Sequence, residues 1–167
     1  MALTYDSIAT TTLSSSANTI TLSSIPSTYT DLRMVAFIKL VGGPSGNVAN
    51  EFFQFNGDTA SNYSRVRLLS YNSAISSSFI NNSDSALQTF TPGAGVPGLS
   101  VFDIMSYSGS TFKTVIWSDS ANNTTGAVVR NIGLWRSTSA INSITWGNAG
   151  DTYAAGTTIT LYGIKKA

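Results

Sequence analysis

Apolar and polar residues alternate with a period of two along most of this chain, a pattern that predicts β-strands. In Asn18–Leu22, for example, the alternation places Ile20 and Leu22 on one buried face and turns the threonines outward. Alternation predicts strands at residues 18–22, 143–146 and 157–162, longer apolar stretches predict them at 33–41, 99–107, 112–117 and 127–135, and four more are predicted at 8–13, 51–55, 65–71 and 86–90.

Turn-forming residues separate the predicted strands at short intervals. Asn56-Gly57-Asp58 follows the strand Glu51–Phe55, and Asn and Gly accept the positive φ angles of a type I′ turn, so a hairpin is predicted here. The loop between Tyr107 and Phe112 is short, which makes the strands on either side of it antiparallel neighbours.

Longer breaks fall at Gly42–Gly46 and Pro92–Gly98, and the serine runs Ser14–Ser16 and Ser76–Ser78 are predicted to be loop tips. No amphipathic helix of three turns interrupts the pattern. About ten short antiparallel strands without a change of composition predict one all-β domain over residues 1–167. The expected architecture is a β-sandwich resembling a jelly roll.

The amino-acid composition excludes most kinds of catalytic site. The chain has 167 residues, of which 10% are charged, with no cysteine, no histidine and a net charge of +1. Ser and Thr together make up roughly 28% of the residues and supply most of the polarity. Thiol nucleophiles, Ser-His triads, disulfide scaffolds and most zinc or iron sites are therefore excluded.

Nucleic acid and membranes are not expected partners. The basic residues are scattered, and the two close groups, Lys165–Lys166 and Arg65 with Arg67, are interpreted as solvated strand edges or tails. The longest apolar run, Met34–Val41, is interrupted by Lys39 and is too short to cross a bilayer. The N-terminus lacks the features of a signal peptide, so folding in a cytoplasm is expected.

Candidate acids and metal ligands have simpler structural interpretations. Glu51, Asp58 and Asp103 could serve a glycoside hydrolase only if two of them faced each other, but Asp58 follows a turn glycine and Asp103 lies in a strand pattern. The loop Asn56–Asn62 has the oxygen content of a calcium site but only one carboxylate, so turn formation is favoured. No catalytic residue, cofactor or metal site is predicted.

The aromatic residues fall into two groups. Trp117 and Trp135, like Trp146, lie in strand patterns and are predicted to pack in the core. Tyr29, Tyr63 and Tyr153 lie in a loop-like context and are the candidates for exposed contact with a partner.

Several blocks of this sequence resemble one family of proteins. They include Tyr5–Leu13, Ser24–Leu32, Phe55–Ser64, Val129–Thr145 and Tyr153–Ala167, with Ser73–Gly98 matching least well. Together they resemble small virion proteins of tailed bacteriophages, frequent among cyanophages and other aquatic phages. The resemblance implies a structural protein of the phage particle, assembled in the bacterial cytoplasm, and it assigns no functional residue.

Two places in the particle follow from this resemblance as expectations. A fibre tip needs a shaft, and the predicted strands leave no residues for one, so a capsid decoration or cement protein that binds the major capsid protein at subunit junctions is favoured. Local symmetry at such junctions favours a homotrimer. The alternative is a tail or fibre protein that binds a receptor or carbohydrate, and a glycan-degrading enzyme is the least favoured class.

Overall fold

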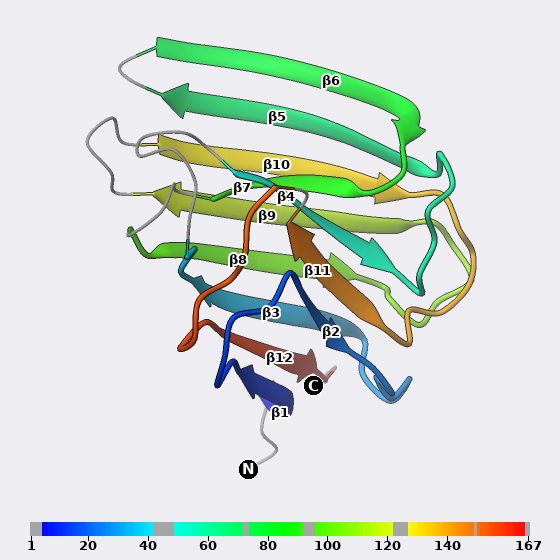
Figure 1. Cartoon of the computed structure of the whole chain (residues 1–167). Helices are drawn as coiled ribbons and strands as arrows, with labels where there is room; N and C mark the ends of the chain where they lie inside the picture. The colour runs from blue at the N-terminus through cyan, green and yellow to red at the C-terminus, as the bar shows by residue number, and fades with distance from the viewer. Residues whose placement is uncertain are drawn as a thin grey trace.

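Two antiparallel β-sheets face each other in this protein, seen here in a computed structural model (Figure 1). The structure describes residues 5–41, 49–71, 74–91, 96–121, 127–148 and 150–165, and these residues form twelve strands and no helix. The predicted all-β sandwich is confirmed. The predicted loop at Gly42–Gly46 and residues 92–95 of the Pro92–Gly98 break lie outside the described residues.

The sheets are unequal in width, and every pair of neighbouring strands is antiparallel. The large sheet contains, in spatial order, β1 (Tyr5–Thr12), β12 (Thr158–Ile164), β3 (Asp31–Ile38), β8 (Gly98–Met105), β9 (Lys113–Ala121), β10 (Ala127–Trp135), β5 (Tyr63–Tyr71) and β6 (Ala74–Asp84). The small sheet contains β2 (Thr19–Leu22), β11 (Ile144–Asn148), β4 (Ala49–Phe55) and β7 (Leu87–Thr91).

The chain passes repeatedly from one sheet to the other, so strands close in sequence often lie in different layers. In Figure 1 the small sheet lies in front of the large one, with β6 at one edge of the large sheet and β1 at the other. Only the inner face of the large sheet is covered by the small sheet. Its outer face has no described layer packed against it.

Aromatic side chains fill much of the space between the sheets. Phe53 of β4 meets Phe102 of β8 and Trp117 of β9 edge-on, with ring centroids 4.6 and 5.5 Å apart. Trp146 packs edge-on against Phe102 from the small sheet, at 5.0 Å. The prediction that Trp117, Trp135 and Trp146 belong to the core is confirmed, since each is at most 2% exposed.

A second part of the same interior is polar. Asp119 of β9 accepts hydrogen bonds from Thr89 Oγ1 at 2.6 Å and from Asn131 Nδ2 at 3.1 Å. Arg65 of β5, which is 4% exposed, donates to the backbone oxygen and the side-chain oxygen of Gln88. These buried groups are therefore hydrogen-bonded within the protein, as burial of polar atoms requires.

Two local predictions are corrected by the structure. Ser76–Ser78 is not a loop tip but the middle of β6, an edge strand of eleven residues that pairs with β5. At Asn56 and Gly57, φ is 53° and 67°, so the predicted turn forms. It is not a hairpin, because β4 before it belongs to the small sheet and β5 after it to the large one.

Candidate functional site

The outer face of the large sheet exposes an unusual group of apolar side chains. Val66, Leu68, Phe79, Ile116 and Ile132 are 48, 52, 65, 41 and 55% exposed, and we call them the outer apolar patch. They lie outward because the alternation of each strand sends its other residues toward the small sheet. Contiguous apolar surface of this kind marks an interaction site more often than scattered exposed residues do.

The strand register aligns four members of the patch in one row. Phe79 of β6 lies opposite Val66 of β5, Val66 opposite Ile132 of β10, and Ile132 opposite Ile116 of β9. Leu68 lies two residues along β5 from Val66, on the same face. Directly opposite residues on one face are in side-chain contact distance, so the row forms a continuous apolar band across four strands.

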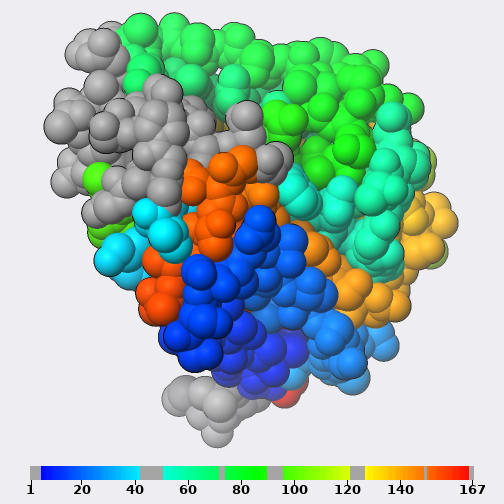
Figure 2. Space-filling model, in the orientation of Figure 1, coloured from blue at the N-terminus to red at the C-terminus, as the bar shows by residue number. Residues whose placement is uncertain are grey.

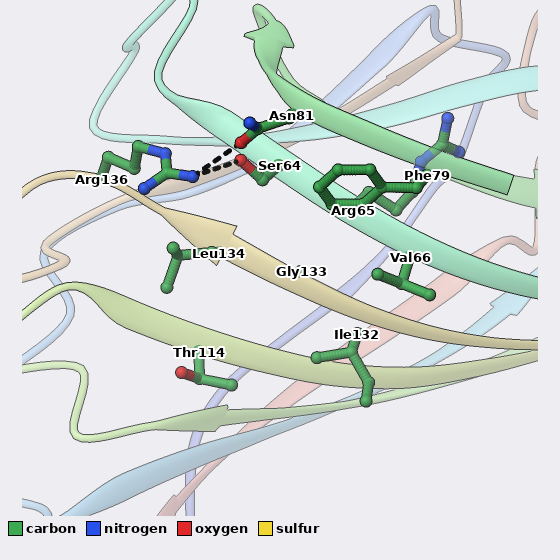
Figure 3. Close-up of a pocket in the computed structure, with 10 residues that line it drawn as sticks. All are labelled: Ser64, Arg65, Val66, Phe79, Asn81, Thr114, Ile132, Gly133, Leu134 and Arg136. Atoms are coloured by element: carbon green, nitrogen blue, oxygen red, sulfur yellow. Dashed lines mark hydrogen bonds between the residues drawn. The ribbon is translucent and has the colours of Figure 1, made fainter.

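Hollows along this face follow the band. One holds about 240 Å³ and is lined by Val66, Phe79 and Ile132 together with the aliphatic Leu134. Figure 3 shows how Arg136 closes one end of it, where its Nη2 donates hydrogen bonds to Ser64 Oγ at 3.1 Å and Asn81 Oδ1 at 3.0 Å. A second hollow of about 280 Å³ lies on the Leu68 side of the same row.

Few charges interrupt the outer face. Arg130 lies in the row beside the band and donates to Ser118 Oγ. Arg33 and Asp103 form a two-bond ion pair farther along the sheet, with Nε–Oδ1 at 2.8 Å and Nη2–Oδ2 at 3.0 Å. Its hydrogen bond to Asp103 raises the pKa of Arg33 despite partial burial. Asp103 is therefore held in a structural pair.

The three tyrosines predicted to contact a partner lie in three different places. Tyr63 and Tyr153 are fully buried, so the expectation that they are exposed is wrong for both. Tyr63 begins β5, where its hydroxyl donates to Asp58 O and accepts from Phe55 N–H, each at 3.1 Å. Burial raises the pKa of Tyr63, and burial together with the Glu51 carboxylate raises that of Tyr153.

Tyr29 is half-buried at the end of the large sheet near the last strand. Its ring lies over Gly163 so closely that a Cβ built on that glycine would be 2.3 to 2.4 Å from the ring. Lys165 Nζ lies 5.6 Å from the ring centroid, a cation–π contact. The role that the structure shows for Tyr29 is packing within this chain.

The three acids weighed for hydrolysis are also apart from one another. Glu51 is fully buried near Tyr153, Asp103 lies on the outer face, and Asp58 lies in the turn before β5. Glycoside hydrolysis requires two carboxyl groups facing each other across one bond, and these three do not meet that requirement. Within the described ranges, no three acidic, histidine or cysteine side chains gather where a metal ion could be held.

Asp58 uses both carboxylate oxygens within the protein. Its Oδ1 accepts from Ala60 N–H at 2.9 Å, and its Oδ2 accepts from Trp135 Nε1 at 2.7 Å and Asn62 Nδ2 at 2.9 Å. Burial alone would raise the pKa of Asp58, but these hydrogen bonds outweigh it and lower the pKa. The loop Asn56–Asn62 is thus tied to the core through Trp135.

The basic residues predicted to lie at solvated edges or tails occupy different environments in the structure. Arg65 is buried beneath the sheet, so its interpretation as a solvated edge residue is wrong, and burial is the main cause that lowers its pKa. Lys165 is half-exposed and pairs with Asp6 of β1, which raises its pKa. Lys166 lies outside the described residues. Among the parts of the chain that the structure describes, no helix has the length and hydropathy to span a membrane.

Sequence reasoning missed the outer apolar patch, although a signal for it exists. In β10, Val128 and Ile132 occupy outward positions while Asn131 and Gly133 occupy inward ones. Apolar residues at both odd and even positions normally indicate a strand that is buried on both faces, and this obscures the signal in β10. Polar or glycine residues on the core side of an apolar strand distinguish a strand that exposes an apolar face from one that is buried on both faces.

Comparison with known proteins finds weak structural likenesses. No family model matches the chain, and no curated protein matches it. The enzymatically active domain of tailspike protein 2 from bacteriophage CBA120 is 14% identical with a TM-score of 0.41, covering 98% of this chain and 29% of that one. This chain therefore spans under a third of that domain's length.

Two other solved structures are still less similar. An alginate lyase from Pseudomonas aeruginosa is 9% identical with a TM-score of 0.28, covering 83% of this chain and 67% of that one. A protein of unknown function from Shewanella oneidensis MR-1 is 12% identical with a TM-score of 0.24, covering 86% and 63%. At such low scores none of these likenesses bears on function.

Proposed function

We propose that this chain is a structural protein of a tailed-phage particle, and that it acts as a capsid decoration protein bound at subunit junctions of the head. The phage assignment rests on the sequence blocks that resemble small virion proteins. The docking role rests on one structural observation, the outer apolar patch on the face of the large sheet that no described layer covers.

The patch suits attachment to an extended protein surface. Its side chains come from four neighbouring strands of one rigid sheet, so they present a fixed face rather than a flexible loop. The outward positions around it combine serine, threonine and single charges with further exposed apolar side chains, among them Ile75, Leu99 and Val128. A contact made of apolar and hydroxyl groups should weaken little as salt rises.

The patch is tested by Ile132→Asp, which places a carboxylate in the middle of the band. Binding of this variant to particles that lack the protein should fall at least tenfold, since docking would desolvate an unpaired charge. Ser7→Asp on β1, an exposed residue outside the patch, is the charge-matched control and should bind normally. Unchanged binding by Ile132→Asp would show that this face does not dock.

The place in the particle is tested by copy number. A decoration protein at capsid junctions should be present in hundreds of copies per particle, measured against the major capsid protein in purified virions. Particles without it should lose resistance to heat or osmotic shock. A few dozen copies or fewer would contradict the capsid assignment and favour the tail. The predicted homotrimer concerns the protein bound at a capsid junction and stays a prediction, to be tested by the number of copies at each junction in purified virions.

The hollow in Figure 3 favours a second candidate, a carbohydrate-binding component of the tail or a fibre. It combines an exposed aromatic ring, Phe79, with amide, hydroxyl and guanidinium groups from Asn81, Ser64 and Arg136. That mixture of apolar and polar groups is what a small-ligand site needs. Binding of the purified protein to host cells, lost in Arg136→Ala, would support this candidate over capsid decoration. Neither candidate predicts glycan cleavage.

A further inference from the structure

Strand β6 ends the large sheet with an unusually open edge. Within the described residues no strand pairs with its other side, so one row of its backbone donors and acceptors faces outward. From Ala74 to Ser83 it contains no charged residue and no proline. Natural edge strands are normally protected by charges, proline, short length or bulges, because an open edge recruits another strand. Figure 2 shows β6 (green) along the upper rim of the molecule.

The opposite edge of the same sheet is protected in the usual way. Strand β1 has a register irregularity between Ser7 and Ala9, and its Asp6 forms an ion pair with Lys165. In β6 the register shifts only at the far end, opposite Tyr63 to Arg65, and the pairing from Ala74 to Ile80 is regular. The two edges thus differ in charge and in the regularity of their pairing, two features that decide whether an edge accepts a partner.

The side chains of β6 are arranged symmetrically about Ser77. The segment Ala74-Ile75-Ser76-Ser77-Ser78-Phe79-Ile80 has two apolar residues, three serines and two apolar residues. Ile75 and Phe79 are 77 and 65% exposed, and both lie on the outer face of the sheet. A segment whose polarity is the same in both directions matches itself when one copy is reversed.

We propose that β6 pairs in antiparallel register with β6 of a second copy of this chain, about a two-fold axis at Ser77. Ser77 then lies opposite its own equivalent and Ser76 opposite Ser78 of the other copy. Ile75 lies opposite Phe79 of the other copy, and Ala74 opposite Ile80. Apolar side chains meet only apolar ones and serines meet only serines, and any other two-fold register breaks this match.

A second copy fits this edge better than an unrelated strand does. A two-fold interface requires a surface that is complementary to itself, and the polarity of this segment provides that. The absence of charge removes the like-charge repulsion that a two-fold axis would otherwise create. Pairing would also extend the apolar band, because Phe79 lies beside Val66 on one side and would meet Ile75 of the other copy on the other.

This inference stands apart from the proposed function. It depends on the edge of the sheet and not on the docking of its face, and it holds wherever the protein acts. It differs from the trimer expected from capsid symmetry, because antiparallel pairing of one edge joins two copies and no more.

Disulfide trapping tests the register directly, since the chain has no cysteine of its own. Ser77→Cys would place two thiols directly opposite each other, within the roughly 4.4–6.8 Å between Cα atoms that a disulfide spans. Ile75→Cys lies on the same strand and face, but its two copies would be about 13 Å apart. We expect rapid covalent dimers from Ser77→Cys under mild oxidation and few from Ile75→Cys. Equal rates would overturn the proposed register.

The mass of the protein in solution tests the pairing itself. The unmodified chain should sediment as a dimer that dissociates on dilution, and Ser77→Lys should weaken that dimer by roughly fivefold by placing two like charges opposite each other. Ser7→Lys on β1 adds the same charge at the other edge and should leave the dimer unchanged. A monomer at all concentrations, a trimer, or equal effects of the two lysines would overturn the proposal.

Discussion

Two residues of β9, Trp117 and Asp119, lie two positions apart on the same inner face and are equally buried, at 1% exposed each. Around Trp117 the interior is aromatic, with Phe53 and Phe102 against its ring. Around Asp119 it is polar, with hydrogen bonds from Thr89 and Asn131. One strand therefore passes from an apolar half of the core into a polar one.

Different interactions stabilise the two halves: burial of apolar surface in one and hydrogen bonds in the other. In the aromatic half, stability comes from area removed from water and from close fit, so it depends on side-chain size and shape. In the polar half, burial is tolerated because Thr89 and Asn131 donate hydrogen bonds to Asp119, so stability depends on keeping these bonds. The small sheet can cover both halves because β7 supplies Leu87 to the core and Thr89 to the hydrogen bonds.

The largest effect is expected in the aromatic half, from Trp117→Ala. Removing a fully buried tryptophan should cost about 3 to 5 kcal/mol of unfolding free energy, because it loses apolar burial and leaves a cavity. Urea unfolding measures this cost. Ile116→Ala, at the neighbouring outward position that is 41% exposed, is the control and should cost less than about 1 kcal/mol. Similar costs at both positions would mean that this half is loosely packed.

In the polar half, Asp119→Ala should cost about 2 to 3 kcal/mol, because it leaves buried donors of Thr89 and Asn131 without their acceptor. The same urea unfolding applies. Asp103→Ala removes a carboxylate from the half-exposed ion pair with Arg33 and should cost less than about 1 kcal/mol. An Asp119→Ala variant as stable as the parent protein would show that the polar half does not require its partners.

Tyr63 belongs to both kinds of region, since its ring packs against Trp135 while its hydroxyl is hydrogen-bonded. Tyr63→Phe should cost about 1 kcal/mol at neutral pH through the lost hydrogen bonds. Burial raises its pKa in the folded state, whereas the unfolded chain ionises near pH 10.

The sign of the pH effect follows from that difference. Above about pH 10 the unfolded state loses a proton that the folded state keeps, so stability falls as pH rises. Tyr63→Phe should make the alkaline fall of the unfolding free energy shallower, leaving the part that comes from Tyr107 and Tyr153, whose pKa values burial also raises. Tyr5→Phe, at an exposed position, is the matched control. An equally steep alkaline fall in Tyr63→Phe would contradict the buried phenol's role.

The alternation of apolar and polar residues predicted most of the fold, because a strand with one face on the core has apolar residues at every second position. Ile20 and Leu22 alternate with threonines and are buried as predicted. The sequence did not predict β6, because this edge strand covers little of the core. It has serines at positions where other strands have buried apolar residues. The turn at Asn56–Gly57 is a local property, but which sheet each flanking strand joins is not.

Most of the candidate site could not be predicted from neighbouring residues in the sequence, for a related reason. Tyr63 and Tyr153 follow turn-like residues in sequence, yet contacts with distant strands bury them. In β5, Val66 and Leu69 are both apolar, but only the position of the small sheet decides which of them is exposed. Apart from β10, where inward Asn131 and Gly133 indicate which residues face outward, the outer apolar patch therefore becomes visible only when the two layers are assembled.

The pairing of the first strand with the last has a consequence for how the protein forms during synthesis. β1 ends the sheet and its one described neighbour is β12, so the hydroxyls of Thr10 and Thr160 meet across 150 residues. β2 likewise pairs only with β11 in the described sheet. Contacts so distant in sequence form slowly, because the intervening chain must first be ordered. Residues 5–22 consequently have no strand to join until the ribosome has passed residue 144, and the large sheet closes only after residue 164 has emerged.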